Sequence, residues 1–164
     1  MTISWSLFAF FGLCFVAALS GSVFRPGEWY RQLNKPSWNP PDWLFPVAWT
    51  ALFAMMAISA WLVYRQAGLQ GAGLLALSAW LAQLALNALW SAIFFGARRM
   101  DLALIEVAAL WLAIVWTIVL FWPISTLAGA LMLPYLAWVS FAAFLNWTLL
   151  RINRSTATSV PNDA

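Results

Sequence analysis

Residues that most often perform chemistry in small sites are scarce in this chain, whereas tryptophan is abundant. The 164 residues include no His, one Cys and thirteen Trp. Without imidazole, we expect neither a metal site nor a Cys–His mechanism. Cys14 lies in an apolar stretch without a basic neighbour, and we interpret it as a packing residue. The G-x-S-x-G, Walker A, G-x-G-x-x-G and H-E-x-x-H motifs do not occur, so no catalytic residue is assigned.

Indole rings are therefore the distinctive chemical groups of the sequence. Many Trp residues sit at membrane interfaces, but several here lie well inside apolar stretches. These are Trp49, Trp90, Trp111, Trp116 and Trp138. We expect some of their rings to face protein or a cavity, where they would form a flat wall for a planar aromatic ligand. The alternative is ordinary helix packing with Trp as bulk.

Two side-chain amides lie in the same apolar stretch as Trp90. Because Gln83 and Asn87 are four residues apart, they share one helix face. We interpret Gln83 as an interhelical hydrogen-bonding residue. Asn87 shares its face with Trp80, Trp90 and Phe94, and we expect it to offer one directional hydrogen bond inside an aromatic pocket. A second stripe with the same spacing has a small residue that leaves room: Tyr135, Trp138, Ala142 and Asn146.

Glu106 is the one carboxylate well inside an apolar stretch. An intramembrane charge is costly, so such a residue is a functional candidate by default. Because Glu106 lies about one turn from the expected helix start, we instead expect it and Asp101 to pair with Arg98 or Arg99. A proton relay through Glu106 would need a second titratable group within the membrane, and the sequence offers neither a His nor another carboxylate there.

Five long apolar stretches must position these side chains. Apolar residues make up 65% of the chain and charged residues 8%, which excludes most soluble enzymes. The stretches cover about 3–24, 43–64, 74–95, 102–122 and 127–150, and each reaches about 31 to 36 Å as a helix, enough to cross a bilayer. We predict an all-α integral membrane protein, a bundle of five transmembrane helices forming one domain over 1–154, with a disordered tail over 155–164. A cleaved signal peptide is the alternative for the first stretch.

The charge distribution predicts the orientation of the bundle. All but one of the eight Lys and Arg fall on one side of a five-span arrangement; the exception is Arg65. The positive-inside rule then places the C-terminus in the cytoplasm and the N-terminus outside. No basic run is long enough to follow a nucleic acid backbone. The segment 25–41 combines four prolines with aromatic residues, and we expect it to fold as a lid between the first two spans.

Sequence motifs in the lid and three of the spans identify a resemblance to a known family. The segment 29–56 reads WYRQLNKPSWNPPDWLFPVAWTALFAMM, 83–96 reads QLALNALWSAIFFG, and 134–147 reads PYLAWVSFAAFLNW. These resemble the tryptophan-rich sensory protein family, also called the translocator protein or peripheral benzodiazepine receptor family. The resemblance covers nearly the whole chain, and the K-P-x-W-x-P-P run is specific.

That resemblance implies a receptor or translocator with five transmembrane helices, usually a homodimer, in contact with membrane lipid. Its ligands would be porphyrins such as protoporphyrin IX, or isoquinoline carboxamide and benzodiazepine compounds, with no cofactor required. Similarity to bacterial members suggests a bacterial membrane and a role in tetrapyrrole sensing, regulation or transport. By motif position, the pocket would be lined by Tyr30, Trp38, Pro40, Trp49, Phe53, Asn87, Trp90, Trp138 and Ala142.

Two other functions follow from the same resemblance. One is light-dependent porphyrin degradation, in which Trp38 and Trp138 would act as redox partners. The other is lipid or sterol transport. A sterol ligand is disfavoured because Trp147 stands where the cholesterol motif of animal members has Tyr.

Overall fold

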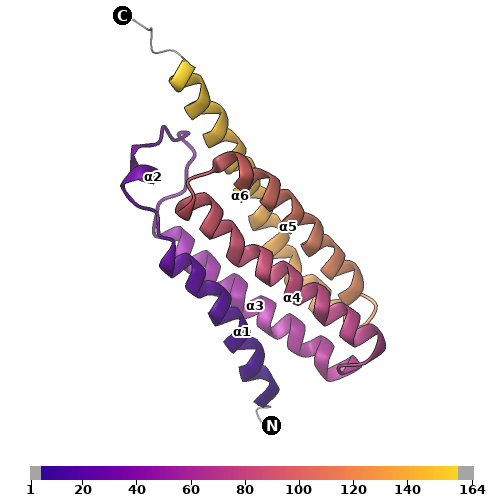
Figure 1. Ribbon diagram of the computed structural model, residues 1–164. Helices are drawn as coiled ribbons and strands as arrows, with labels where there is room; N and C mark the ends of the chain where they lie inside the picture. The colour runs from indigo at the N-terminus through magenta and orange to yellow at the C-terminus, as the bar shows by residue number, and fades with distance from the viewer. Residues whose placement is uncertain (1–4, 159–164) are drawn as a thin grey trace, which may run out of the picture.

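Five long helices, one short helix and one π-helical turn form the secondary structure of residues 5–158, the part of the chain that the computed structural model describes (Figure 1). The long helices are α1 (Trp5–Val23), α3 (Leu44–Ala67), α4 (Gly71–Ser91), α5 (Met100–Phe121) and α6 (Thr126–Thr158). The short helix α2 (Glu28–Gln32) lies between α1 and α3, and a π-helical turn, η1 (Ala92–Gly96), continues α4. The long helices are apolar and long enough to cross a membrane, which confirms the predicted fold class.

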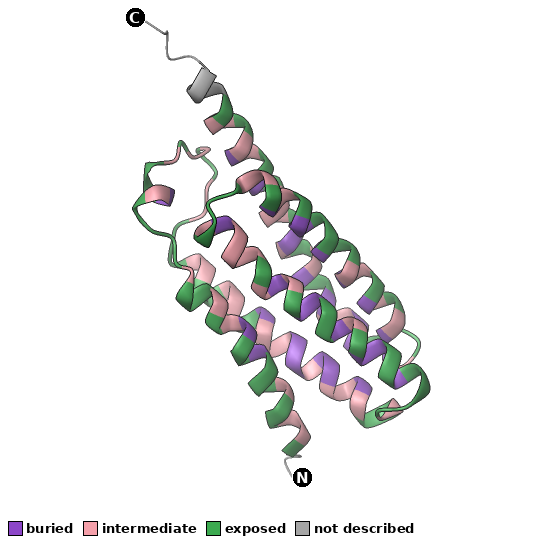
Figure 2. Ribbon diagram, viewed as in Figure 1, coloured by how far each residue is buried: buried purple, intermediate pink, exposed green. Residues whose placement is uncertain are grey.

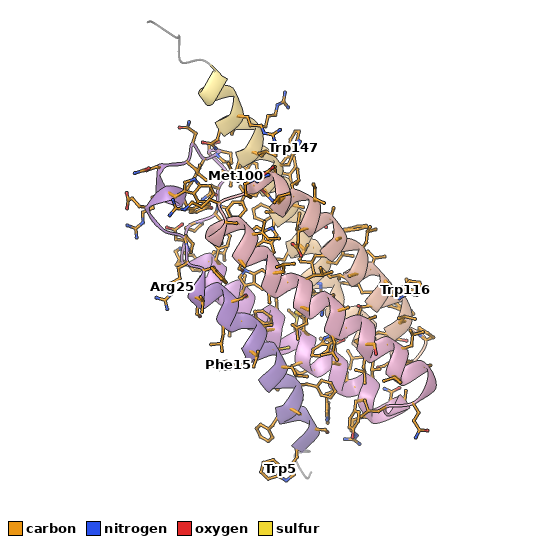
Figure 3. The ribbon with its side chains drawn as sticks, viewed as in Figure 1. Trp5, Phe15, Arg25, Met100, Trp116 and Trp147 are labelled. Atoms are coloured by element: carbon orange, nitrogen blue, oxygen red, sulfur yellow. The ribbon has the colours of Figure 1, made fainter. Side chains whose placement is uncertain are left out.

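The helices pack as a ring in the order α1, α3, α6, α5, α4. Each helix contacts both neighbours in this ring, and α3 also contacts α4 across it. Because the ring has an inner and an outer side, each helix buries only a stripe of residues (Figure 2). The outward residues remain apolar, as expected where acyl chains cover the surface. Figure 3 shows three of them, Trp5, Phe15 and Trp116.

The segment between α1 and α3 is folded, as the prolines and aromatic residues predict. Its helix α2 buries Tyr30, which packs edge-on against Phe94 and Phe95 of η1. This segment lies at the same end of the bundle as the C-terminal part of α6 (Figure 1). The folded segment and the C-terminal part of α6 are therefore both placed where they can cover this end of the bundle interior.

Two of the deep tryptophans lie at the outer surface, and the last helix is longer than the sequence predicts. Trp116 is 55% exposed on the outer surface, so its depth in the span does not turn it inward. Trp111 is also exposed at the surface, where Nε1 donates to Ser140 Oγ at 2.9 Å. The last helix continues to Thr158, four residues into the segment expected to be a disordered tail; the rest of that segment, 159–164, lies outside the described residues.

Candidate functional site

A groove of about 470 Å³ runs along the seam between α3 and α6. Ala48, Ala51 and Leu52 form the α3 side. The α6 side consists of Pro134, Ala137, Trp138 and Phe141. Small residues on both helices leave the space, and the two aromatic rings give it a flat wall. Ala51, Pro134 and Ala137 are exposed, so the groove opens on the outer surface of the bundle instead of forming the enclosed pocket that the sequence suggested.

Aromatic contacts extend from this groove to the lid. Trp138 packs against Phe141 at 5.8 Å and edge-on against Phe45 at 5.9 Å, measured between ring centroids. Trp38 from the lid stacks on Phe144 at 5.3 Å and meets Phe141 edge-on at 6.0 Å. The structure thus brings two predicted site residues, Trp38 and Trp138, onto the same ring, Phe141. The lid reaches the end of the groove through that contact.

A second group of predicted residues meets around Tyr135, the neighbour of Pro134 in α6. The Trp49 ring lies 5.4 Å from Phe53 and 6.2 Å from Tyr135. Asn87 Nδ2 donates to the Tyr135 hydroxyl oxygen at 3.0 Å. This buried bond joins α4 to α6 and holds the Tyr135 ring beside Trp49.

The interhelical role expected of Gln83 is therefore carried out by Asn87. Both Gln83 and Asn87 are buried, but Gln83 Nε2 and Oε1 have no hydrogen-bond partner among the described residues. The assignment of the interhelical bond to Gln83 was wrong: the two amides lie about one helical turn apart, and it is Asn87 that bonds to Tyr135. A ligand hydrogen bond from Asn87 stays a prediction.

Tyr30 and Trp90 lie in a third group beneath the lid. Trp90 stacks on Phe94 with ring centroids 4.9 Å apart, and Tyr30 meets both Phe94 and Phe95 edge-on. Lys35 Nζ lies 4.3 Å from the centroid of the Tyr30 ring. Burial raises the pKa of the Tyr30 hydroxyl, and the nearby Asp42 charge raises it further. This group packs the lid onto the bundle and does not line the groove.

The remaining predicted residues, Pro40 and Ala142, are half-buried and are not among the groove-lining residues. The Pro40 carbonyl accepts a hydrogen bond from Asn39 Nδ2 at 2.9 Å within the lid. The space expected at Ala142 lies instead at Ala137, on the neighbouring face of α6.

The buried carboxylate also differs from expectation. Arg99 forms a two-pronged contact with Asp101, with Nε–Oδ1 and Nη2–Oδ2 distances of 2.8 and 2.6 Å. The predicted pairing of Asp101 is thus confirmed, but that of Glu106 is wrong, because neither Glu106 oxygen has a partner among the described residues.

Asn146, the last residue of the second predicted stripe, joins α6 to the start of α5. Its side-chain amide is oriented so that the nitrogen donates to the Met100 carbonyl at 3.2 Å and the oxygen accepts from Leu104 N–H at 3.1 Å.

Several groove residues escaped the sequence analysis. They are Pro134, Ala137 and Phe141 of α6, with Ala48, Ala51 and Leu52 of α3. A signal was present: Pro134, Ala137 and Phe141 follow the spacing of one helix stripe, directly beside the stripe that we identified. The groove contains no ionisable side chain, and the described part of the chain has no cluster of three metal-ligating residues. Such a site is suited to bind an apolar, flat molecule and offers no acid–base pair.

Comparison with known proteins places this arrangement in a family. The chain matches the TspO/MBR family over residues 10–152. It is 44% identical to the tryptophan-rich sensory protein of Cereibacter sphaeroides over 154 residues, which cover 93% of this chain and 95% of that protein. Protein CrtK of Rhodobacter capsulatus is 44% identical over 151 residues, 92% of this chain and 94% of the relative. The translocator protein of Homo sapiens is 40% identical over 144 residues, 85% of this chain and 83% of the relative. This chain, a multi-pass membrane protein with five spanning helices, therefore belongs to the TspO/MBR family.

Proposed function

We propose that this protein binds a flat, hydrophobic aromatic molecule of the tetrapyrrole class, with protoporphyrin IX as the test ligand, in the α3–α6 groove. The observation that carries the proposal is the groove itself, about 470 Å³ between alanines on one side and the rings of Trp138 and Phe141 on the other. Its volume falls in the range of small-molecule sites, about 300 to 1,000 Å³. Aromatic walls favour a planar π-system because offset stacking and edge contacts add to the burial of apolar area.

The names of the relatives suggest two outcomes of binding. One relative is named a sensory protein and another a translocator protein. A sensor would report the occupancy of the groove to a partner, whereas a translocator would release the ligand elsewhere. Both need reversible capture of the ligand, which is the step that we propose.

The test is direct titration of the protein in lipid nanodiscs with protoporphyrin IX, monitored through porphyrin absorbance. Ala137→Phe places a ring inside the groove, and we expect it to weaken binding at least about tenfold, or roughly 1.4 kcal/mol. Trp138→Phe removes the larger ring and should weaken binding less. Ala109→Phe is the matched control, because Ala109 lies on the outward stripe of α5 between Ile105 and Leu112. Equal affinity for Ala137→Phe and the wild type would contradict a site in this groove.

Illumination of the bound complex separates binding from the enzymatic alternative. In our proposal the porphyrin is recovered unchanged after exposure to light. A new tetrapyrrole product that forms with the wild type, and not with Trp38→Phe or Trp138→Phe, would instead support degradation by these rings.

A further inference from the structure

One side chain of α6, that of Asn153, hydrogen-bonds to the backbone of a lid residue, Asn34. Asn34 N–H donates to Asn153 Oδ1 at 3.0 Å, and Asn153 Nδ2 donates to the Asn34 carbonyl at 3.1 Å. The two residues are 119 positions apart in the chain. One amide thus satisfies both backbone groups of a lid residue, as a neighbouring β-strand would. Asn153 Nδ2 also donates to the Leu149 carbonyl at 2.8 Å, which fixes the side chain on its own helix.

This pair of bonds lies between two aromatic attachments of the lid. On the α2 side, Lys35 lies over the Tyr30 ring, and Tyr30 packs on η1. On the other side, Trp38 lies on Phe144 and Phe141 of α6. Trp38 is 41% exposed, so its contact with α6 is limited and depends on how the preceding residues are held. Asn34 is four residues before Trp38 and supplies that support.

The two Asn34–Asn153 hydrogen bonds, which we call the clasp, are linked to the groove through Trp38 and Phe141. Phe141 is both the residue that Trp38 meets and part of the groove wall. A shift of the lid away from Asn153 would move Trp38 off Phe141, the groove-wall residue that it contacts. Asn153 itself is not among the groove-lining residues, so any effect on a ligand would be transmitted through the lid.

We propose that Asn153 is a positioning residue that clasps the lid to α6 and thereby sets how long a ligand stays in the groove. This inference rests on the proposed function for its ligand and adds the element that controls ligand release. Through these two hydrogen bonds, the end of α6 would take part in ligand binding without contacting the ligand. Because one bond uses the amide oxygen and the other the amide nitrogen, the two can be removed separately.

The experiment compares Asn153→Ala and Asn153→Asp with the wild type in nanodiscs. Ala removes both bonds, whereas Asp keeps an acceptor for Asn34 N–H and loses the donor. Hydrogen–deuterium exchange of residues 33–39 measures lid docking without any ligand. Release of protoporphyrin IX into excess serum albumin measures the dissociation rate. Thr148→Val is the control, because within the described part of the chain Thr148 Oγ1 donates to the Phe144 carbonyl of its own helix and to nothing in the lid.

We expect Asn153→Ala to speed exchange in residues 33–39 and to raise the porphyrin dissociation rate about tenfold, since two hydrogen bonds are lost. Asn153→Asp should fall between Ala and the wild type, and Thr148→Val should match the wild type. Exchange in α3, α4 and α5 should not change, which distinguishes positioning from general loss of stability.

Each other outcome contradicts one identified claim. Unchanged exchange in residues 33–39 would show that the bonds do not hold the lid and would overturn the inference. Faster exchange with an unchanged dissociation rate would overturn the link between lid and groove, while the proposed function would stand. A wild type that binds no porphyrin would overturn the proposed function and with it the effect on release. The exchange data, which need no ligand, would still show whether Asn153 holds the lid on α6.

Discussion

At the scale of single residues, the interior face of α4 contains one satisfied and one unsatisfied amide a single turn apart. Asn87 bonds to the Tyr135 hydroxyl, whereas both polar atoms of Gln83 lack a partner among the described residues, and Gln83 is 0% exposed. A buried polar group without a partner costs about 1 to 3 kcal/mol. The same substitution should therefore have opposite effects at the two positions.

We predict that Gln83→Leu raises the free energy of unfolding by about 1 kcal/mol, because it removes two unpaired polar atoms at similar volume. Asn87→Leu is the matched substitution and should lower the free energy of unfolding by about 0.6 to 1.7 kcal/mol, because it leaves the Tyr135 hydroxyl unpaired. Reversible unfolding in mixed detergent micelles measures both changes. A loss of stability in Gln83→Leu as large as that in Asn87→Leu would mean that Gln83 is hydrogen-bonded in the protein.

At the scale of elements, the turn between α3 and α4 depends on a close approach of backbone to backbone. Gly68 ends α3 with φ of +65°, a conformation that favours glycine. A Cβ atom on Gly73 would lie 2.5 Å from the Gly68 carbonyl oxygen and 2.8 Å from that of Ala67. Because both are backbone atoms, no side-chain movement can relieve the contact. Gly12 of α1, by contrast, has nothing within 4 Å of the same position.

Alanine should therefore have opposite effects at these two helical glycines. We predict that Gly73→Ala lowers the unfolding free energy by about 1 to 3 kcal/mol through overpacking at the turn. Gly12→Ala should raise it by about 0.5 to 1 kcal/mol, since it reduces the backbone freedom of the unfolded chain. The melting temperatures of the two variants in nanodiscs give the comparison. Equal shifts would contradict the tight turn.

At the scale of the whole molecule, the two ends of the bundle differ in charge. The start of α1 and the end of α6 lie at opposite ends of the bundle in Figure 1, with the lid near the end of α6. Arg65 lies near the other end of the bundle, with its guanidinium 5.2 Å from the Trp61 ring centroid. The other basic residues lie in the lid, in the α4–α5 connection and near the end of α6. This asymmetry is the basis of the predicted orientation.

We predict that the C-terminus and the lid face the cytoplasm and that the N-terminus faces outward. In a bacterial host, green fluorescent protein fused to the C-terminus should fluoresce, and alkaline phosphatase fused there should be inactive. The opposite reporter pattern would contradict the positive-inside assignment. The homodimer also stays a prediction. Small residues four positions apart on a membrane helix let a second helix pack closely. On α4, Ser78 and Ala82 form such a pair and are both exposed, whereas in the pair of Ala72 and Ala76 the second residue is fully buried and unavailable to a second copy.

Features that depend on local chemistry could be predicted from the amino-acid sequence. A run of about twenty apolar residues must form a helix in a bilayer, because unpaired backbone groups are too costly there, so the spans followed from composition. The prolines and aromatic residues of 25–41 likewise predicted a folded lid. The Asp101 pairing was predictable because Arg99 is two residues away.

Features that depend on how each helix is placed and which helix it contacts became visible in the packed bundle alone. Asn87 and not Gln83 faces Tyr135, Trp116 faces outward, and the groove follows the stripe of Ala137 instead of that of Ala142. Each difference is a rotation of a fraction of a turn, which helical periodicity in an almost uniformly apolar sequence does not specify. The Asn34–Asn153 clasp joins residues 119 positions apart, so it exists only once the ring has closed and brought the lid to the end of α6.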